Sequence, residues 1–258
     1  MGRPALAIGG VALIAMGMAI ALNWWWPRTA QADAEVSQHI HTVRLSDSDG
    51  DVTVRVDDTT RQTSVHETFR YSWGKPDTAY TVDGDTLVLG GCGHNCTVSY
   101  TVVVPSGTTF TGTEDSGDVT LDGLASVDVQ ANSGKVTAHD VSGAATVHAK
   151  SGDVELSAID GATTVQTNSG AVHAEGLRGN TDVTADSGDV VLSTDAVVDV
   201  HAKANSGDIA VTVPMASYRI AGSSDHDDRR TIDVPTDPNA AHTLDLTADS
   251  GDVKVNAR

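Results

Sequence analysis

Hydrophobic and polar residues alternate along most of the chain, and the alternation recurs with a fixed period. A Ser-Gly signature, usually continued by Asp-Val, has its serines at Ser116, Ser133, Ser151, Ser169, Ser187, Ser206 and Ser250. The first five intervals are 17, 18, 18, 18 and 19 residues, and a degenerate unit begins 18 residues after the sixth serine, at Ser224. Self-similarity at a fixed period indicates a repeat architecture.

Apolar residues occupy fixed columns within the repeat. The column three residues after each serine contains Val119, Val136, Val154, Val172, Val190, Ile209 and Val253. Further apolar columns lie five residues after the serine and four and two residues before the next one, with polar residues between them. A period of two predicts strands with one face inside. Because one unit cannot bury its inner face alone, we expect an all-β solenoid, or stacked β-roll, of ~18-residue rungs with two strands each.

A glycine follows each of these serines and marks the corner between two strands. These corner residues are Gly117, Gly134, Gly152, Gly170, Gly188, Gly207 and Gly251. We expect them to adopt positive φ, which glycine does at no steric cost. The alternative is that glycine serves only as a small turn residue.

The pattern divides the chain into three parts. Residues 113–258 hold the regular repeats, and residues 33–112 fit the same scheme loosely, with an early rung at residues 48–54 and most of the aromatic residues. We expect that region to cap the solenoid or to have a thicker core. No cap is expected at the other end, where the chain stops on a strand and Lys254 and Arg258 would discourage edge-to-edge pairing.

Residues 1–32 form the third part, an N-terminal membrane segment. Ala5–Leu22 is an apolar run, extended by Trp24–Trp26. As a helix, Ala5–Trp26 would reach about 33 Å, enough to cross a hydrocarbon core of ~30 Å. We therefore expect a single-pass transmembrane helix at the cell membrane, with the β domain extracellular. The alternative is a signal peptide cleaved near Ala32, after Ala30-Gln31-Ala32, which would release a secreted chain.

The net charge limits the possible partners, and the cysteine content indicates the compartment. The chain has 16 Lys+Arg against 35 Asp+Glu, a formal net charge of −19, and such a surface repels nucleic acid. The 2 cysteines, Cys92 and Cys96, lie between two expected strands, and we expect a disulfide outside the cytoplasm. A metal site of Cys92, His94 and Cys96 is the alternative, but it lacks a fourth nearby ligand.

Acidic residues gather at the corners of the last rungs. Candidate Ca²⁺ ligands there are Asp186, Asp189, Asp208, Asp249 and Asp252. The alternative is a solvated acidic corner built from turn-forming aspartates. The acidic run at residues 225–228 is expected to be an exposed loop, since Arg229 and Arg230 follow it. The histidines occupy different columns and no Gly-x-Ser-x-Gly elbow occurs, so we expect no enzyme, no catalytic residues and no cofactor.

The repeats, together with Asp-Gly-Asp-Val-Thr-Val at residues 49–54 and Val-Val-Pro-Ser-Gly at residues 103–107, resemble the bacterial putative-adhesin family of β-strand repeat proteins. The resemblance covers about residues 35–258. It implies a non-enzymatic, β-solenoid-like domain at the bacterial cell envelope, with adhesion as its role and a part in envelope stress responses. It provides no catalytic residues.

The chain is therefore expected to be a membrane-anchored, cell-surface adhesin or envelope binding module. Its acidic faces would contact cationic peptides, divalent cations or basic components of the envelope or a host surface. One alternative is a scaffold that self-assembles through the uncapped last strand. A further alternative is an extracellular β-helix enzyme acting on carbohydrates.

Overall fold

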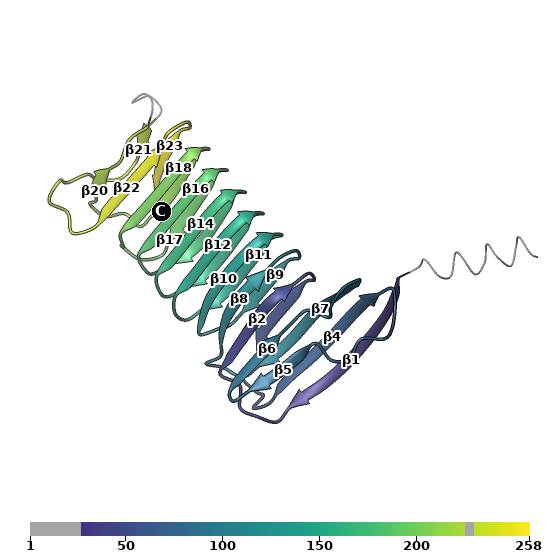
Figure 1. Cartoon of the computed structure of the whole chain (residues 1–258). Helices are drawn as coiled ribbons and strands as arrows, with labels where there is room; N and C mark the ends of the chain where they lie inside the picture. The colour runs from purple at the N-terminus through teal and green to yellow at the C-terminus, as the bar shows by residue number, and fades with distance from the viewer. Residues whose placement is uncertain (1–26, 225–229) are drawn as a thin grey trace, which may run out of the picture.

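The computed structural model describes residues 27–224 and 230–258, which form 23 strands and no helix. The strands make two sheets of 12 and 11 strands, here called sheet A and sheet B, that face each other along an elongated stack (Figure 1). Within the described residues no helix is long and apolar enough to span a bilayer. Most of the expected membrane segment, residues 1–26, lies outside them.

Residues 109–213 form the regular part of the stack, in which each repeat gives one strand to each sheet. Sheet B receives β8 (Thr109–Glu114), β10 (Ser126–Ser133), β12 (Ala145–Ser151), β14 (Thr163–Ser169), β16 (Thr181–Ser187) and β18 (Val200–Ser206). Sheet A receives β9 (Val119–Asp122), β11 (Val136–Val141), β13 (Val154–Ile159), β15 (Val172–Leu177), β17 (Val190–Thr194) and β19 (Ile209–Val213). Each strand pairs in parallel with the strand one repeat away, which confirms the solenoid-like stack.

The core is a narrow space between the sheets, filled by the inward columns. Val154 lies directly beside Val136 and Val172 in the parallel register, and all three side chains are 0–1% exposed. Full burial of a valine stabilises by roughly 1.5–3 kcal/mol, whereas an exposed ion pair contributes ~0–1 kcal/mol. The inner columns therefore hold the stack together, and the surface charges are free for other roles.

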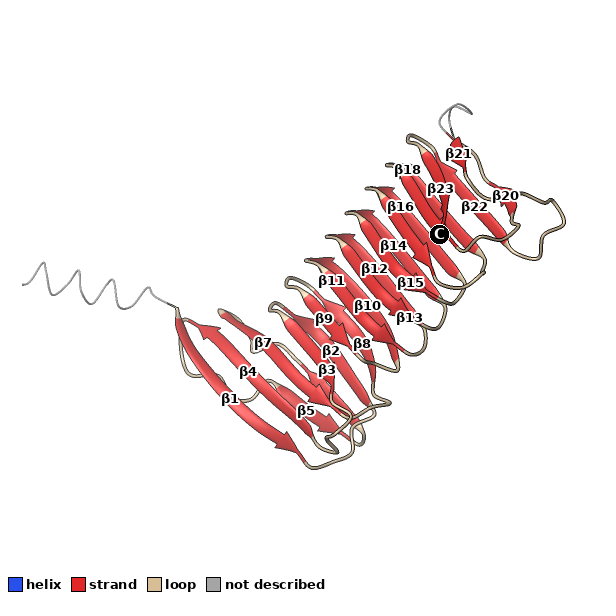
Figure 2. Cartoon of the chain, turned by 180° about the vertical axis from the view of Figure 1, so that it is seen from behind, coloured by secondary structure: helices blue, strands red, loops and turns tan. Residues whose placement is uncertain are grey.

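The N-terminal region extends the stack and then changes its pairing. The first rung consists of β2 (Thr42–Ser48) and β3 (Val52–Val56), next to β8 and β9. Outside that rung lie β4 (Thr63–Tyr71), β5 (Tyr80–Asp83), β6 (Thr86–Leu89) and β7 (Cys96–Val104). Strand β4 and then β1 (Arg28–Val36) join sheet A antiparallel, beyond β7 (Figure 2). Buried aromatic side chains thicken this end of the core: Phe69, Tyr100 and Phe110.

The expectation of a bare last strand at the C-terminus is wrong. The final rung, β22 (Thr243–Ala248) and β23 (Val253–Ala257), lies between β18/β19 and an outer rung of β20 (Arg219–Ala221) and β21 (Arg230–Ile232). The degenerate unit therefore passes over one rung position, and the last unit of the chain returns to fill it (Figure 1). Arg230 stabilises this outer rung by donating to the carbonyl oxygens of Ala221 and Gly222, at 2.6 and 3.0 Å.

Candidate functional site

The corner glycines are stacked more closely than a side chain allows. Gly152 has φ of 125°, and its amide donates to the carbonyl oxygen of Ser169 at 3.0 Å. A Cβ atom at this position would overlap the carbonyl oxygen of Gly134 in the preceding rung. The other six corner glycines have φ between 109° and 158°. Both positive φ and close backbone approach therefore require glycine here.

The aspartates that follow these glycines act as caps between rungs. Asp153 accepts a hydrogen bond through Oδ1 from the backbone amide of Ala171, one rung further, at 2.9 Å. Asp189 and Asp208 accept in the same way from the amides of Asp208 and Asp252, at 2.9 and 2.8 Å. Each such carboxylate satisfies a backbone donor that the sheet ladder does not reach at the corner.

The five candidate Ca²⁺ ligands are not brought together as one set of ligand atoms. Asp189, Asp208 and Asp252 follow one another at the corner, each one rung apart, and Asp186 accepts from the side-chain amide of Asn205 at 2.9 Å. The backbone amide of Asp249 donates to the carbonyl oxygen of Ala204 at 2.9 Å. Within the described part of the chain, the one group of three ligand atoms within 4.8 Å of each other is Asp122, His139 and Asp140.

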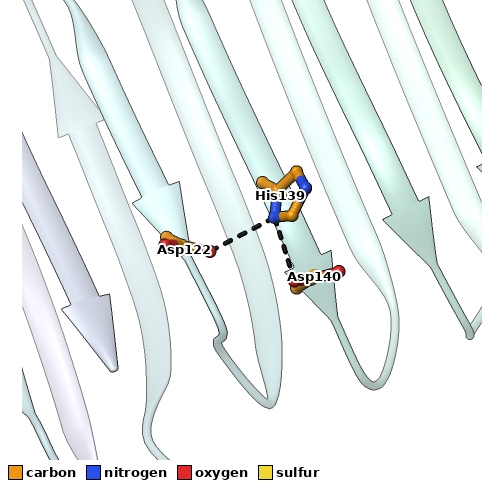
Figure 3. A group of neighbouring side chains, drawn as sticks. All are labelled: Asp122, His139 and Asp140. Carbon is orange, nitrogen blue, oxygen red and sulfur yellow. Dashed lines mark hydrogen bonds and ion pairs between the residues drawn. The ribbon is translucent and has the colours of Figure 1, made fainter. Parts of the chain in front are cut away.

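This Asp-His-Asp cluster lies on sheet A, across β9 and β11 (Figure 3). His139 Nδ1 lies 3.3 Å from Asp122 Oδ1 and 3.1 Å from Asp140 Oδ2. One nitrogen and two carboxylate oxygens could hold a divalent cation such as Zn²⁺, with water completing the coordination. All three side chains are more than half exposed, so the cluster also suits an ordinary surface ion pair with protonated histidine.

Asp140 belongs to a second column of residues with positive φ, near the ends of the sheet A strands, that the sequence did not reveal. Gly123, Asp140, Ala158 and Gly176 lie at equivalent positions of successive repeats and have φ of 76°, 51°, 54° and 66°. Only two of the four are glycine, so no glycine signature marks this column. Aspartate tolerates the left-handed region through local hydrogen bonding, whereas alanine adopts it at an energetic cost.

The two cysteines form a disulfide, Cys92–Cys96, with a Cα–Cα distance of 5.6 Å, which joins the loop after β6 to the first residue of β7. The loop between them contains Gly93 and Asn95, both with positive φ, and the backbone carbonyl of Asn95 accepts from the amide of Ser72 at 3.2 Å. Because each sulfur is bonded to the other, neither provides a thiolate for a metal beside His94. The bond joins the loop to the edge of the N-terminal core.

Glu114 is a buried acid that sequence reasoning missed. It is 0% exposed at the end of β8, in the column where later repeats have alanine or threonine, next to Ala131 in the register. Burial raises its pKa to about 8, and the carboxylates of Asp49, Asp115 and Asp51 add to the rise, while the backbone of Ser116 offsets part of it. A glutamate in an otherwise small, apolar column was the available signal.

Glu67 is a second buried acid, on β4. It is 1% exposed, its Oε1 accepts from the amide of Ala79 at 2.7 Å, and burial raises its pKa. The hydroxyl of buried Tyr100 donates to the carbonyl of Gly90 at 2.7 Å. Burial, and then the charge of Glu67, raise the pKa of that hydroxyl. These polar contacts are local to the N-terminal region.

An open hollow of about 470 Å³ on sheet B gathers exposed carboxylates from several rungs. We call it the acidic hollow, and its charged and polar lining includes Asp182, Asp199, Asp245, Asn180, His201 and Thr164. His201 Nδ1 lies 3.3 Å from Asp245 Oδ2, and Asp199 Oδ1 accepts from the amide of Thr243 at 2.8 Å. The register places Asp182, His201 and Asp245 side by side on β16, β18 and β22. Such a row can bind ammonium or guanidinium groups.

Comparison with known proteins assigns most of the repeat region to a family of known sequence pattern. The family model described as Toastrack DUF4097 matches residues 94–256, and this match confirms the resemblance drawn from the repeats. A putative cell adhesion protein from Clostridium sporogenes is 11% identical, with 90% of this chain and 100% of that chain covered and a TM-score of 0.29. A putative adhesin from Bacteroides fragilis is 13% identical, with 90% and 97% covered and a TM-score of 0.38. No curated protein matches the chain.

Proposed function

This chain belongs to the Toastrack DUF4097 family, and we propose that it is a membrane-anchored, cell-surface binding module of adhesin type that acts without catalysis. The observation that carries the proposal is the acidic hollow, which the parallel stack holds in fixed register on sheet B. Asp182 and Asp245 come from separate strands of one ladder, and Asp199 lies directly before β18. A surface that is organised before the ligand arrives loses little conformational entropy on binding.

The chemistry of the hollow favours a cationic ligand. Asp182 and Asp245 lie two strands apart, on either side of His201, which corresponds to ~10 Å at the usual strand spacing. Two lysine or arginine side chains of an extended peptide can reach both carboxylates at once. The formal net charge of −19 would also draw cationic ligands toward this surface at low ionic strength.

The position of Ala30-Gln31-Ala32 supports an uncleaved anchor. These residues lie within β1 and pair with Phe69, Thr68 and Glu67 of β4. Cleavage after Ala32 would remove residues 28–32 of a strand that spans Arg28–Val36. The loss of five of the nine residues of this edge strand would cost pairing with β4, which favours a chain that keeps its N-terminal segment.

The structure weakens the alternative of a scaffold that self-assembles through the last strand. Assembly through the last strand required an open edge on β23, and β21 pairs with Val253–Val255 of that edge. The outer strands that the structure describes at this end are short, Arg219–Ala221 and Arg230–Ile232. Strands this short are poor templates for pairing with another chain.

The proposal is tested by measuring binding of the full chain, in detergent micelles, to an octa-lysine peptide. We expect Asp182→Asn combined with Asp245→Asn to weaken binding at least tenfold, and raised salt to weaken binding to the wild type. The matched control is Asp122→Asn combined with Asp140→Asn, which removes the same charge from sheet A. Equal losses in both double variants, or no binding by the wild type, would contradict a site in the hollow.

A further inference from the structure

Strand β1 leaves a long sheet edge open at the N-terminal end. It spans Arg28–Val36 and pairs with β4 over all nine residues without a register shift. No other strand of the described residues pairs with its second edge. The outermost strands elsewhere are much shorter, with 4 residues in β5 and 3 each in β20 and β21. The unpaired backbone groups of a long, regular edge are a template for another strand.

The side chains of β1 differ sharply between its two faces. Ala30, Ala32 and Ala34 are half-buried and lie on the side of the core, opposite Phe69, Glu67 and Val65 of β4. The exposed face carries Thr29, Gln31, Asp33 and Glu35. Any strand that is added to this edge must therefore bring small apolar side chains on one face and avoid carboxylates opposite Asp33 and Glu35.

A second copy of β1 meets both requirements in one register. We propose that β1 pairs antiparallel with β1 of a second copy, centred on Ala32, and that this pairing makes a symmetric dimer. Gln31 then lies opposite Asp33 of the second copy, and Thr29 lies opposite its Glu35. Alanine faces alanine along the core side. Both polar pairs join a hydrogen-bond donor to a carboxylate, and the interface is isologous, as two-fold symmetry requires.

Other registers are worse for definable reasons. Centring on Asp33 places Asp33 opposite Asp33 of the second copy, a direct pair of like charges. Centring on Gln31 or on an outer alanine shortens the paired segment. A centre between two residues puts the polar face of one strand on the core side of the other, because side chains alternate with a period of two. The centre at Ala32 pairs all nine residues without opposing like charges.

One unfavourable contact accompanies this register and predicts a salt dependence. Asp33 of each copy lies diagonal to Asp33 of the other, at ~7–8 Å. Each of these carboxylates is already within 2.5 Å of Nδ1 of its own His66, which offsets part of the repulsion when the histidine is protonated. Moderate salt should therefore strengthen the dimer. A nine-residue pairing is smaller than a standard interface, so the dimer is weak unless both copies share one membrane.

The register is tested by disulfide trapping in the full chain, purified in detergent. The native cysteines are bonded to each other, so an introduced cysteine is the only free thiol. Differently tagged Thr29→Cys and Glu35→Cys chains are mixed and oxidised, and we expect heterodimers to be trapped. Each variant alone should trap little, because its two cysteines would be six residues apart along the strand, ~20 Å. Equal trapping in all three samples, or none in the mixture, would overturn the register.

A charge substitution then tests the β1–β1 pairing without an introduced disulfide. We expect Gln31→Asp to weaken the dimer about tenfold in sedimentation experiments, because it places an acid opposite Asp33 in both symmetric pairs. Gln31→Lys should tighten the dimer by a similar factor. The matched control is Gln130→Asp, which adds the same charge to an exposed position on β10 and should leave the association unchanged. Association through the apolar N-terminal run would make all these variants alike, and that result would sink the proposal. The ligand of the acidic hollow plays no part in this experiment.

Discussion

The repeat region and the N-terminal region share two facing sheets but complete their cores by different means. Between Thr109 and Val213 the core is filled mainly by Val, Leu, Ile and Ala, and a glycine and usually an aspartate hold each corner. The N-terminal region pairs strands antiparallel and buries Phe69 and Tyr100, together with the carboxyl group of Glu67. Glu114 is buried at the junction between the two regions.

The difference shows what a repeat achieves physically. In the stack, every rung makes the same backbone hydrogen bonds and apolar contacts with its neighbour. One short sequence motif, repeated, is therefore enough to build the whole stack. An end of the stack has no neighbour on one side and needs a separate solution. The N-terminal region uses extra antiparallel strands and buried polar groups, and the C-terminal end uses an outer rung secured by Arg230.

The largest expected effect is at a corner of the stack. We expect Gly152→Ala to cost at least ~3 kcal/mol of unfolding free energy, because the new methyl group overlaps the backbone of Gly134. The matched control in the N-terminal region is Gly84→Ala, with φ of 64° and no atom within 4 Å of the new Cβ. It should cost only ~1 kcal/mol, measured by urea unfolding. Similar costs at the two sites would show that φ alone matters.

Glu114 should make the junction sensitive to pH. Its pKa rises from 4.5 to about 8 on folding, so the folded state keeps a proton that the unfolded state releases. This group therefore lowers the unfolding free energy by roughly 1.4 kcal/mol per pH unit as the pH rises from ~4.5 to ~8. Glu114→Gln should remove that slope and be the more stable protein at pH 8.

The control for this prediction is Glu155→Gln, an exposed glutamate within the stack, paired with Lys135 at 2.6 Å. Chemical denaturation at pH 5, 6.5 and 8 separates the two variants. A wild type whose stability follows the same pH curve as Glu114→Gln would show that the carboxyl group of Glu114 is not held in its neutral form.

A smaller effect is expected from the corner caps. Asp153→Ala removes the acceptor of the Ala171 amide and should cost ~1 kcal/mol. Asp153→Asn keeps an oxygen in the same place and should cost less than half as much. The comparison requires thermal unfolding of both variants in one buffer. Equal losses would mean that the charge of the aspartate matters and its hydrogen bond does not.

The smallest effect is a gain in stability at the second column of positive-φ residues. Ala158 has φ of 54°, where glycine is free of strain, so Ala158→Gly should raise the stability by ~0.5–1 kcal/mol. Ala149→Gly, at a buried strand position on β12 with ordinary φ, should instead lower it by a similar amount. A loss at both positions would contradict the strain assigned to Ala158.

The sequence was sufficient to predict the stack because its contacts repeat. The column of six valines and one isoleucine has seven members, as has the set of corner glycines, so their period and faces could be read from the chain. The register of Val154 beside Val172 follows from that period. The order of the last rungs could not be read in this way, because stacking order equals chain order only while each unit is followed by a similar one.

The candidate sites were harder to predict for a related reason. Asp182 is a neighbour of His201 through the regular repeat, but Asp245 is one only because the degenerate unit lies outside the last rung, which brings β22 next to β18. The left-handed backbone positions at Asp140 and Ala158 carry no glycine. Glu114 is a single glutamate in a column that otherwise holds alanine or threonine. This signal is visible only after the column has been identified.

The central claim is that repeats stack in one parallel register, including the inserted last rung. Spin labels test it directly, with one at Thr111 and a second, in turn, at Thr164, Asp182, His201 or Asp245. These positions share one column of sheet B, three, four, five and six strands from β8. The account predicts distances that grow linearly by ~4.8 Å per strand, to ~29 Å at Asp245. A distance to Asp245 that exceeds the linear value by a further strand, or no linear growth at all, would contradict it.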